Sequence, residues 1–393
     1  MKLPIVKPRF PKIDVRESMF ESPCLATWAA ELDDCLDDGI VTNNGLHVQL
    51  FERKLTDYLG APTLAFNSGM SALTAMLLAA DVRGGEVILP SFTFPATPQA
   101  VILAGATPVF ADIDPNTLTI DPADAELRIT DNTKAILAVD VYGIPSRYDE
   151  LAMIAKDDGV WFLVDSAPAF GSYADGKPVG CNADAQIFSF HATKPFSTME
   201  GGCLCSKEAG FIYDAAAFRN FGQHEHGVYP YGLNGKMMEV CALIGLEQLK
   251  TWDVASKVRK SAAAMLRLQL GEMVEIELPF PNPMDSPIWT YCPILVDEAA
   301  LKCTRDEFRF GLAGKGIERR AYYTACHKFY GGEAQLPITD EIARRVVALP
   351  VYNDMTTEEI DYIVDSIKEL VAECKTSSSS VPVAISASPS AAS

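Results

Sequence analysis

Hydrophobic residues in the first half of the chain fall into short, almost uninterrupted runs. The runs have the length and composition of buried strands, and they are Glu86–Leu89, Val109–Ile113, Ala135–Val141, Trp161–Val164 and Ala185–Phe190. Between two of these runs, Leu151–Lys156 carries apolar residues at helical spacing. Strands that are apolar on both faces and alternate with helices are typical of a parallel sheet covered on both sides. The pattern therefore predicts an α/β fold with a large, mostly parallel sheet.

A second pattern begins near residue 255 and predicts a smaller α+β domain. Its expected elements are a helix over 256–270, an extended run at Trp289–Val296, a helix at Arg305–Gly314, a strand-like run at Glu318–Tyr323 and a final helix at Thr357–Cys374. We therefore expect a large domain over 1–255 and a small domain over 256–375. The tail, 376–393, is nearly all Ser, Ala, Val and Pro, and its composition predicts disorder.

Composition narrows the function classes. A chain of 393 residues is longer than a single hydrophobic core usually supports, which agrees with two domains. The net charge of −19 repels phosphate backbones, so nucleic-acid binding is not expected as a main function. No apolar window is long enough to span a membrane and Met1–Pro4 does not resemble a secretory signal, so we expect a cytoplasmic protein. The ten cysteines are scattered without zinc-type spacing, which predicts reduced, buried thiols and no metal.

Three polar segments stand beside strand ends, where open α/β sheets bind ligands. Asn67–Leu73 opens a helix after the apolar run Thr63–Phe66; its N–H groups suit an anion, although an ordinary strand-to-helix turn has the same pattern. Asp165 ends a strand and fits either a ligand contact or a helix N-cap. Lys194 follows another strand end, where a lysine is more often simply solvated.

Taken together, the three segments match the chemical needs of pyridoxal phosphate (PLP). This cofactor needs an anion site for its phosphate, a carboxylate against its ring nitrogen, and a lysine that forms a Schiff base with its aldehyde. The chain presents an anion turn at Gly69, then Asp165, and then Lys194 only 29 residues later. That order is what a fold-type-I aminotransferase requires.

The sequence resembles the DegT/DnrJ/EryC1/StrS sugar aminotransferase family from about Thr42 to Leu370. The matching segments are Thr42–Gly45, Pro90–Phe94, Ser189–Lys194, Gly232–Met237 and Leu349–Pro350. Asn234–Met237 and the segment from Arg319 to His327 are most similar to enzymes that aminate C4 of dTDP-4-keto-6-deoxyglucose.

The resemblance implies roles for the matching residues. Lys194 would form the Schiff base and carry the proton, and Asp165 would pair with the pyridinium nitrogen. The other implied cofactor contacts are Phe94 and Ala167 on the two ring faces, Ser189 with the N–H groups of Gly69 and Met70 at the phosphate, and Asn234 from a partner subunit. The resemblance therefore implies a homodimer with shared sites. Phe94 is also compatible with an ordinary core position.

Three positions depart from the family pattern, and one of them is Lys236, which replaces the commoner Arg but suits the C4-aminating subgroup. Met70 stands where Thr or Ser is usual, and the neighbouring Ser71 could supply the missing hydroxyl. Pro168 stands where Gln or His is usual. For a sugar nucleotide, the candidate contacts are Lys236, Arg319, Arg320, Tyr322, Tyr323, His327 and Lys328. Each cation among them is equally compatible with a solvated basic turn.

We therefore expect a PLP-dependent aminotransferase that moves an amino group from glutamate to a 4-keto-6-deoxy sugar nucleotide. Amination at C3 and sugar dehydration remain alternatives, although relatives that dehydrate carry His where this chain has Lys194. A non-enzymatic regulator is a further alternative. The intact Lys194, Asp165 and Ser189 disfavour it.

Overall fold

The central sheet confirms the predicted α/β class. The computed structural model describes residues 1–4, 30–33, 35–37, 39–330 and 334–376. Its main sheet has the order β1-β9-β8-β5-β4-β2-β3, with bounds β1 (Thr63–Phe66), β2 (Glu86–Pro90), β3 (Thr107–Ala111), β4 (Thr133–Val139), β5 (Trp161–Asp165), β8 (Ala185–Ser189) and β9 (Gly202–Ser206). The five predicted hydrophobic runs are all strands, each within two residues of the expected ends. Their pairings with one another are parallel.

The strand β9 was not predicted, and it makes one edge of the sheet antiparallel. It pairs antiparallel with β8 on one side and with β1 on the other. Gly201 precedes it and Gly202 is its first residue, and both were interpreted only as a turn. A Cβ at Gly202 would lie 2.7 Å from the backbone nitrogen of Gly69, so the absence of a side chain lets β9 pass beside the start of α3 (Gly69–Ala79).

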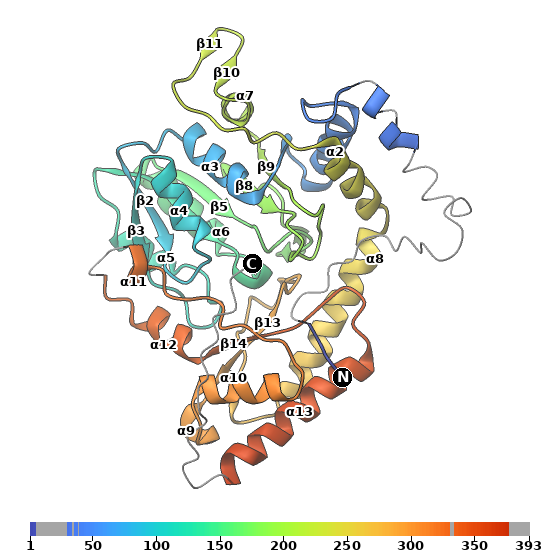
Figure 1. Ribbon diagram of the computed structural model, residues 1–393. Coiled ribbons are helices and arrows are strands. Elements are labelled where there is room, and N and C mark those ends of the chain that lie inside the picture. The colour runs from blue at the N-terminus through green and yellow to red at the C-terminus, as the bar shows by residue number, and fades with distance from the viewer. Residues whose placement is uncertain (5–29, 34, 38, 331–333, 377–393) are drawn as a thin grey trace.

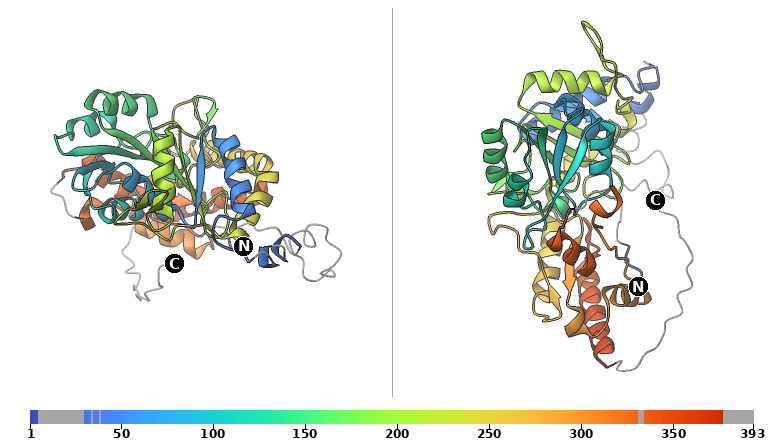
Figure 2. Two further views of the ribbon diagram at one scale, coloured as in Figure 1. Left: turned by 90° about the horizontal axis from the view of Figure 1, so that it is seen from above. Right: turned by 90° about the vertical axis from the view of Figure 1, so that its left-hand side faces the viewer.

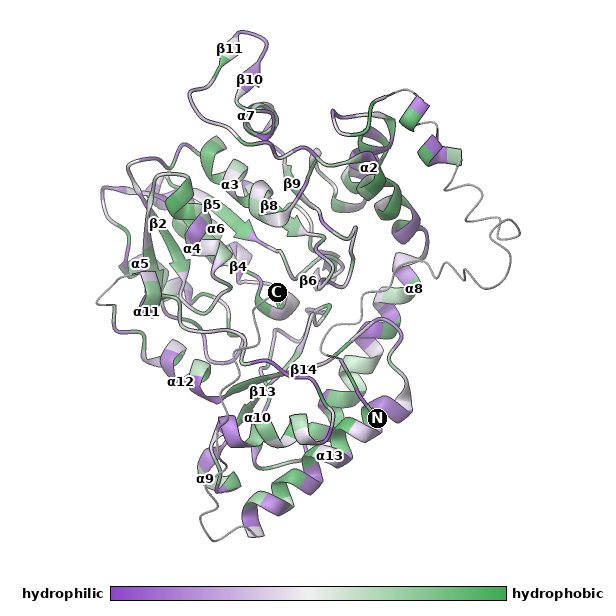
Figure 3. Cartoon of the chain, in the orientation of Figure 1, coloured by the Kyte–Doolittle hydropathy of each residue, from purple (hydrophilic) through white to green (hydrophobic). Residues whose placement is uncertain are grey.

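Helices cover both faces of this sheet, as Figures 1 and 2 show. Besides α3 they are α2 (Leu46–Leu59), α4 (Ala96–Leu103), α5 (Pro122–Leu127), α6 (Tyr148–Asp158) and α7 (Ala209–Arg219). Alternate residues of β5 enter different cores: Phe162 and Val164 pack in one cluster, and Leu163 packs in the other. This explains the uninterrupted apolar runs, because both faces of each strand are buried. Accordingly, the strands are predominantly hydrophobic in Figure 3, whereas the outer helices carry polar faces.

Short elements complete the large domain. The 3-10 turn η1 (Val141–Gly143) follows β4, and two small hairpins pair β6 (Tyr173–Ala174) with β7 (Lys177–Pro178) and β10 (Gln223–His224) with β11 (Gly227–Val228). The β10–β11 hairpin projects from the body of the molecule in Figure 1.

The C-terminal part has its own antiparallel sheet and hydrophobic core. The sheet contains β12 (Ile276–Glu277), β13 (Cys292–Val296) and β14 (Val346–Leu349), and the helices are α9 (Glu298–Leu301), α10 (Arg305–Gly314), α11 (His327–Tyr330), α12 (Pro337–Arg345) and α13 (Thr357–Thr376). The expected helices at 305–314 and 357–374 are therefore present. The expected strand at Glu318–Tyr323 was wrong, because only an isolated bridge between Arg320 and Ala348 forms there.

Helix α8 (Glu239–Leu270) joins the two parts and runs without a break through residue 255, where the domain division was predicted. Leu3 also crosses that division, since its N–H donates to the carbonyl of Gly316 and its side chain belongs to the C-terminal core. The division into 1–255 and 256–375 stays a prediction, and the tail 377–393 lies outside the described residues. In the described part of the chain, no helix is long and apolar enough to cross a membrane.

Candidate active site

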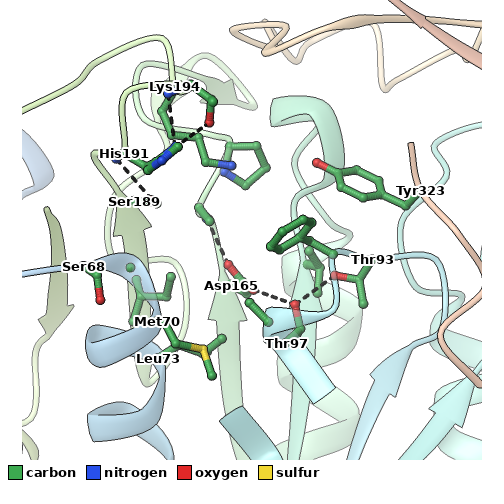
Figure 4. A pocket seen from close by; sticks show the side chains of 18 of the residues that line it. Ser68, Met70, Leu73, Thr93, Thr97, Asp165, Ser189, His191, Lys194 and Tyr323 are labelled. Atoms are coloured by element: carbon green, nitrogen blue, oxygen red, sulfur yellow. Dashed lines mark hydrogen bonds between the residues drawn. The ribbon is translucent and has the colours of Figure 1, made fainter. Parts of the chain in front are cut away.

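A cavity of 390 Å³ lies at the carboxyl ends of β5 and β8, within the size range of small-molecule sites. It brings together residues that are far apart in the sequence, among them Ser68, Gly69, Met70, Phe94, Thr97, Asp165, Ala167, Ser189, Lys194, Tyr322 and Tyr323. Figure 4 shows Asp165 inside this cavity, with Thr97 and Thr93 on one side and Ser68 and Met70 on the other. The three segments singled out in the sequence therefore meet in one place.

The carboxylate of Asp165 is buried and held by two hydrogen bonds. Thr97 donates its hydroxyl at 2.9 Å, and the N–H of Ala167 donates at 3.1 Å. Thr93 supports this arrangement, since its hydroxyl lies 2.9 Å from that of Thr97. Burial raises the pKa of Asp165, and these hydrogen bonds and the charge of Lys194 act against that rise. Because burial is the largest effect, the pKa of Asp165 is raised overall, and a positive charge placed against the side chain would stabilise its carboxylate form.

Lys194 comes from the turn after β8, where its N–H donates to the carbonyl of His191 at 2.8 Å. Burial lowers the pKa of Lys194, because the ammonium form loses its hydration. The negative charge of Asp165 raises that pKa, but it is the smaller effect. The lysine is thus displaced toward its neutral, nucleophilic form, which a solvated surface lysine would not be.

The start of α3 forms an anion-binding end of the cavity. A Cβ at Gly69 would lie 2.7 Å from Cβ of Ser189, so the glycine keeps this corner open. Ser68 caps the helix by accepting the N–H of Ser71 at 3.1 Å. The unpaired N–H groups and the helix dipole at this end favour a negative group.

The structure separates the two serines near Met70. The Ser71 hydroxyl lies 3.0 Å from that of Ser68, and Ser71 does not line the cavity. Ser68 does line it, although the sequence analysis did not propose it. Met70 and Pro168, two of the three departures from the family pattern, line the cavity, whereas the third, Lys236, does not.

Aromatic side chains form the remaining walls. Phe94 is 54% exposed, so the core alternative for this residue was wrong. The rings of Tyr322 and Tyr323 stack with their centroids 5.5 Å apart, and Tyr142 donates its hydroxyl to the carbonyl of Tyr322. Tyr291, also in the wall, was missed by the sequence analysis.

Four of the predicted substrate contacts do not line the cavity of this chain. Arg319 donates through Nε to the carbonyl of Arg309, and Arg320 bridges to Ala348 of β14. His327 is buried with Nδ1 2.7 Å from the hydroxyl of Ser91, and Lys328 forms an ion pair with Asp340.

Contacts with Arg309, Ser91 and Asp340 hold Arg319, His327 and Lys328, whereas the bridge to β14 fixes only the backbone of Arg320. Their predicted contact with substrate is therefore not supported by the geometry within one chain.

Asn234 and Lys236 also lie outside the cavity and contact each other. Nζ of Lys236 is 2.8 Å from Oδ1 of Asn234 and 3.1 Å from Oδ1 of Asn220. Lys236 also lies over the ring of Phe221, which is half-exposed. These contacts place the two predicted residues on the surface segment beside the β10–β11 hairpin.

Comparison with known proteins agrees with this site. Residues 26–368 match the model of the DegT/DnrJ/EryC1/StrS aminotransferase family. The chain belongs to this family. It is 36% identical over 337 residues to a dTDP-4-amino-4,6-dideoxy-D-glucose transaminase of Shigella dysenteriae, which covers 84% of this chain and 91% of the relative. It is 29% identical to a GDP-perosamine synthase of Escherichia coli O157:H7, over 87% of this chain and 95% of the relative.

Solved structures show the same fold. DesI, determined with its TDP-sugar product, superposes with a TM-score of 0.85 at 31% identity, over 94% of each chain. The PLP form of the sugar aminotransferase Spr1654 from Streptococcus pneumoniae superposes with a TM-score of 0.84 at 26% identity, over 95% of this chain and 100% of that one. The protein is therefore an aminotransferase, as its sequence predicted.

The hydroxyl of Thr97 offers a test of how Asp165 is held. Thr97→Val keeps the shape but removes the hydrogen bond to the carboxylate, and such a bond to a charged group contributes about 1.5–3 kcal/mol. We expect kcat to fall about 10- to 100-fold, with little change in KM for the amino acceptor. Thr63→Val is the matched control, since Thr63 is a buried strand residue that donates to the carbonyl of Ala61. Equal losses in both variants would mean that Thr97 has only a packing role.

Proposed function

We propose that this aminotransferase uses PLP to move an amino group from glutamate to C4 of a dTDP-4-keto-6-deoxy sugar. The observation that carries the proposal is the meeting of Lys194 and Asp165 in one cavity with the glycine-lined end at Gly69. The choice of sugar rests on the 36% identity to the transaminase named for dTDP-4-amino-4,6-dideoxy-D-glucose.

The residues of the cavity fit PLP group by group. The space that a Cβ at Gly69 would fill, together with Ser189 and the first N–H groups of α3, suits the phosphate. Asp165 suits the ring nitrogen, and Lys194 suits the aldehyde. Phe94 and Ala167 line the same cavity and suit the two faces of the ring. When bound, PLP would supply the aldehyde and an electron-accepting ring, which the protein itself lacks.

In the first half-reaction, Asp165 and Lys194 have separate tasks. The Asp165 carboxylate, oriented by Thr97, would stabilise a proton on the ring nitrogen of a bound cofactor. Lys194, displaced toward its neutral form by burial, takes the proton from Cα of glutamate through Nζ. The hydroxyl of Ser189 and the N–H groups at the start of α3 keep the phosphate end fixed while this proton moves.

In the second half-reaction, the same Nζ of Lys194 handles the proton at C4 of the keto sugar. Tyr322 and Tyr323 border the cavity and would pack against the sugar while they exclude water. The order of events reverses that of the first half, so that the amino group leaves on the sugar and Lys194 is again available.

A homodimer with shared sites is part of the proposal. Asn234 and Lys236 lie outside the cavity of their own chain, on a segment beside a projecting hairpin, and this position supports a contact with the site of a second copy. Light scattering at the mass of two chains would support it, and a monomer that retains full activity would contradict it. The cytoplasmic location remains a prediction from the sequence.

Two measurements on the purified protein test the function. Glutamate alone should convert the yellow bound cofactor to its amino form, with one equivalent of 2-oxoglutarate released. The amino form should then be consumed by dTDP-4-keto-6-deoxyglucose. Identification of the product gives the amination position. A C3 amine would support amination at C3 and a dehydrated sugar would support dehydration, and either would contradict this proposal. If glutamate left the bound cofactor unchanged, the proposed transamination from glutamate would be contradicted.

Gly69 provides a separate test of the phosphate end. In Gly69→Ala the new methyl group would meet Ser189 at 2.7 Å, which is closer than carbon atoms approach without a shift. We expect PLP affinity to fall at least about 10-fold, since the loss of a fixed phosphate contact costs on the order of 1.4 kcal/mol or more. Titration of the cofactor-free protein, followed by fluorescence, measures it. Gly210→Ala is the control, because a Cβ there meets nothing within 4 Å.

A further inference from the structure

Three side chains with metal-binding atoms converge at a place far from Lys194 in the sequence and outside its cavity. They are Cys35, His47 and Glu239, and their donor atoms all lie within 4.8 Å of one another. Cys35 belongs to the helical segment before α2, His47 to the first turn of α2, and Glu239 to the first turn of α8. They line a second cavity, with a volume of 870 Å³, that shares no residue with the first.

The distances suit one tetrahedral ion. Sγ of Cys35 lies 3.1 Å from Nδ1 of His47, and the same Nδ1 lies 3.3 Å from Oε2 of Glu239. Zinc binds sulfur at about 2.3 Å and nitrogen or oxygen at about 2.0–2.1 Å, so neighbouring donors around a tetrahedral ion stand roughly 3.3–3.6 Å apart. The third pair, Sγ of Cys35 and the carboxylate of Glu239, lies within 4.8 Å, so the side chains need only adjust their positions locally to surround the ion.

The buried carboxylate of Glu239 is a separate indication that a cation binds here. Its side chain is buried with only 1% exposed, and its Oε1 has no hydrogen-bond partner among the described residues. The other oxygen accepts the N–H of His47 at 2.7 Å. A Cβ at Gly45 would come 2.6 Å from Cδ of Glu239, so the glycine lets the chain cross directly over the carboxylate. A buried carboxylate with an unpaired oxygen is costly unless a cation balances it.

Among the described residues, Glu239 has His47 as an ion-pair partner. The ion pair between His47 and Glu239 exists only when the imidazole is charged. A divalent ion bound to a thiolate, a neutral imidazole and a carboxylate would instead give a site of zero net charge, since two negative ligands meet two positive charges. Sulfur, nitrogen and oxygen donors together favour Zn²⁺ over Mg²⁺ or Ca²⁺, which prefer oxygen alone.

We propose that Cys35, His47 and Glu239 bind one Zn²⁺ per chain, with water from the adjoining cavity as the fourth ligand. No metal was predicted from the sequence, because the three ligands are separated by 11 and 191 intervening residues and form no recognisable spacing. The ion would tie the segment before α2 to the start of α8. That start directly follows Asn234 and Lys236, so the metal would stabilise the base of the segment assigned above to the partner's site.

Cobalt and zinc titrations of the chelator-treated, full-length protein test the proposal. We expect one equivalent of Co²⁺ to bind, with a thiolate-to-cobalt absorption band in the near ultraviolet, and Zn²⁺ to displace it. Zn²⁺ should also raise the Tm of the protein, because an ion that binds only the folded state stabilises it. Neither readout depends on aminotransferase activity, so the metal site is tested separately from the proposed function.

Variants assign the ligands. Cys35→Ser and His47→Gln should each weaken metal binding at least about 100-fold and remove the Tm increase, since even outer contacts of metal sites contribute 10- to 100-fold. Cys35→Ser should also remove the near-ultraviolet band. Cys303→Ser is the matched control. The sulfur of Cys303 lies 2.8 Å from that of Cys374, so these two thiols are the alternative place where a metal ion could bind. It should leave one-equivalent binding intact.

Three results would overturn the proposal. The first is the absence of one-equivalent binding to the wild-type chain in the micromolar range, which would leave His47 and Glu239 as a plain ion pair. The second is binding that survives Cys35→Ser and is lost in Cys303→Ser. The third is binding that survives His47→Gln and Glu239→Gln together. Cooperative thermal unfolding of each variant in chelator establishes that it is folded.

Discussion

Lys194→Ala should reduce glutamate-dependent amination at least about 10⁴-fold and leave the protein colourless after incubation with PLP. The substitution removes the amine that reacts with the cofactor aldehyde and also the group that moves the proton at Cα and at C4. Proton transfer by a positioned side chain alone contributes about 10²–10⁴-fold. Stopped-flow absorbance with glutamate, and product analysis with the keto sugar nucleotide, measure the two half-reactions separately.

Lys156→Ala is the matched control for this prediction, since Lys156 is an exposed lysine on α6. It should retain wild-type rates. Turnover above about 1% of the wild-type rate in Lys194→Ala would show that Lys194 is not the essential catalytic residue. A variant that lost activity but still formed the yellow complex would move the Schiff-base lysine elsewhere in the cavity.

Asp165→Asn is expected to lower kcat by on the order of 10²–10³-fold while PLP still binds. The amide keeps the size of the side chain and can still contact Thr97, but it cannot offset a positive charge on the ring nitrogen. Losses of this size accompany the removal of one electrostatic contact from a preorganised active site. Single-turnover rates with glutamate measure the effect, and a change confined to KM would contradict it.

Asp165→Asn has a second, opposite signature in the cofactor-free protein. The charge of Asp165 raises the pKa of Lys194, so its removal should lower that pKa further. Lys194 would then be neutral at lower pH, and its reaction with PLP would begin at lower pH than in the wild type. Asp157→Asn, on the exposed face of α6, is the control and should move neither the rate nor the pH profile.

Much of the fold was readable from the sequence because burial on both faces imposes a strong pattern on parallel strands. All five hydrophobic runs became strands of one sheet. The strand β9 escaped because its glycine-rich start resembles a turn, and its antiparallel pairing is decided by β8 and β1. The run at Glu318–Tyr323 had strand composition, but it forms only a single bridge, between Arg320 and Ala348 at the edge of β14.

The candidate site divides in the same way. Lys194, Asp165 and Gly69 could be predicted because each occupies a strand or helix end, where the chain direction alone determines the place of the side chain. Thr97, Ser68 and Tyr291 could not, because their roles arise from contacts across the fold.

The assigned substrate contacts show the same limit. Arg319 and His327 were assigned to substrate by similarity, and in the structure they contact the carbonyl of Arg309 and the hydroxyl of Ser91, so their role toward substrate stays a prediction. Local sequence does not report such distant hydrogen bonds.

By itself, the sequence determined the α/β class, the order of phosphate turn, carboxylate and lysine, and the aminotransferase chemistry that this order supports. Only the tertiary structure decided which hydroxyl orients Asp165, which aromatic rings wall the cavity, and that Cys35, His47 and Glu239 meet. The physical reason is the distance along the sequence between the residues that interact. Periodicity and strand ends are local properties of the chain, whereas a buried carboxylate acquires its partners only when segments almost two hundred residues apart pack together.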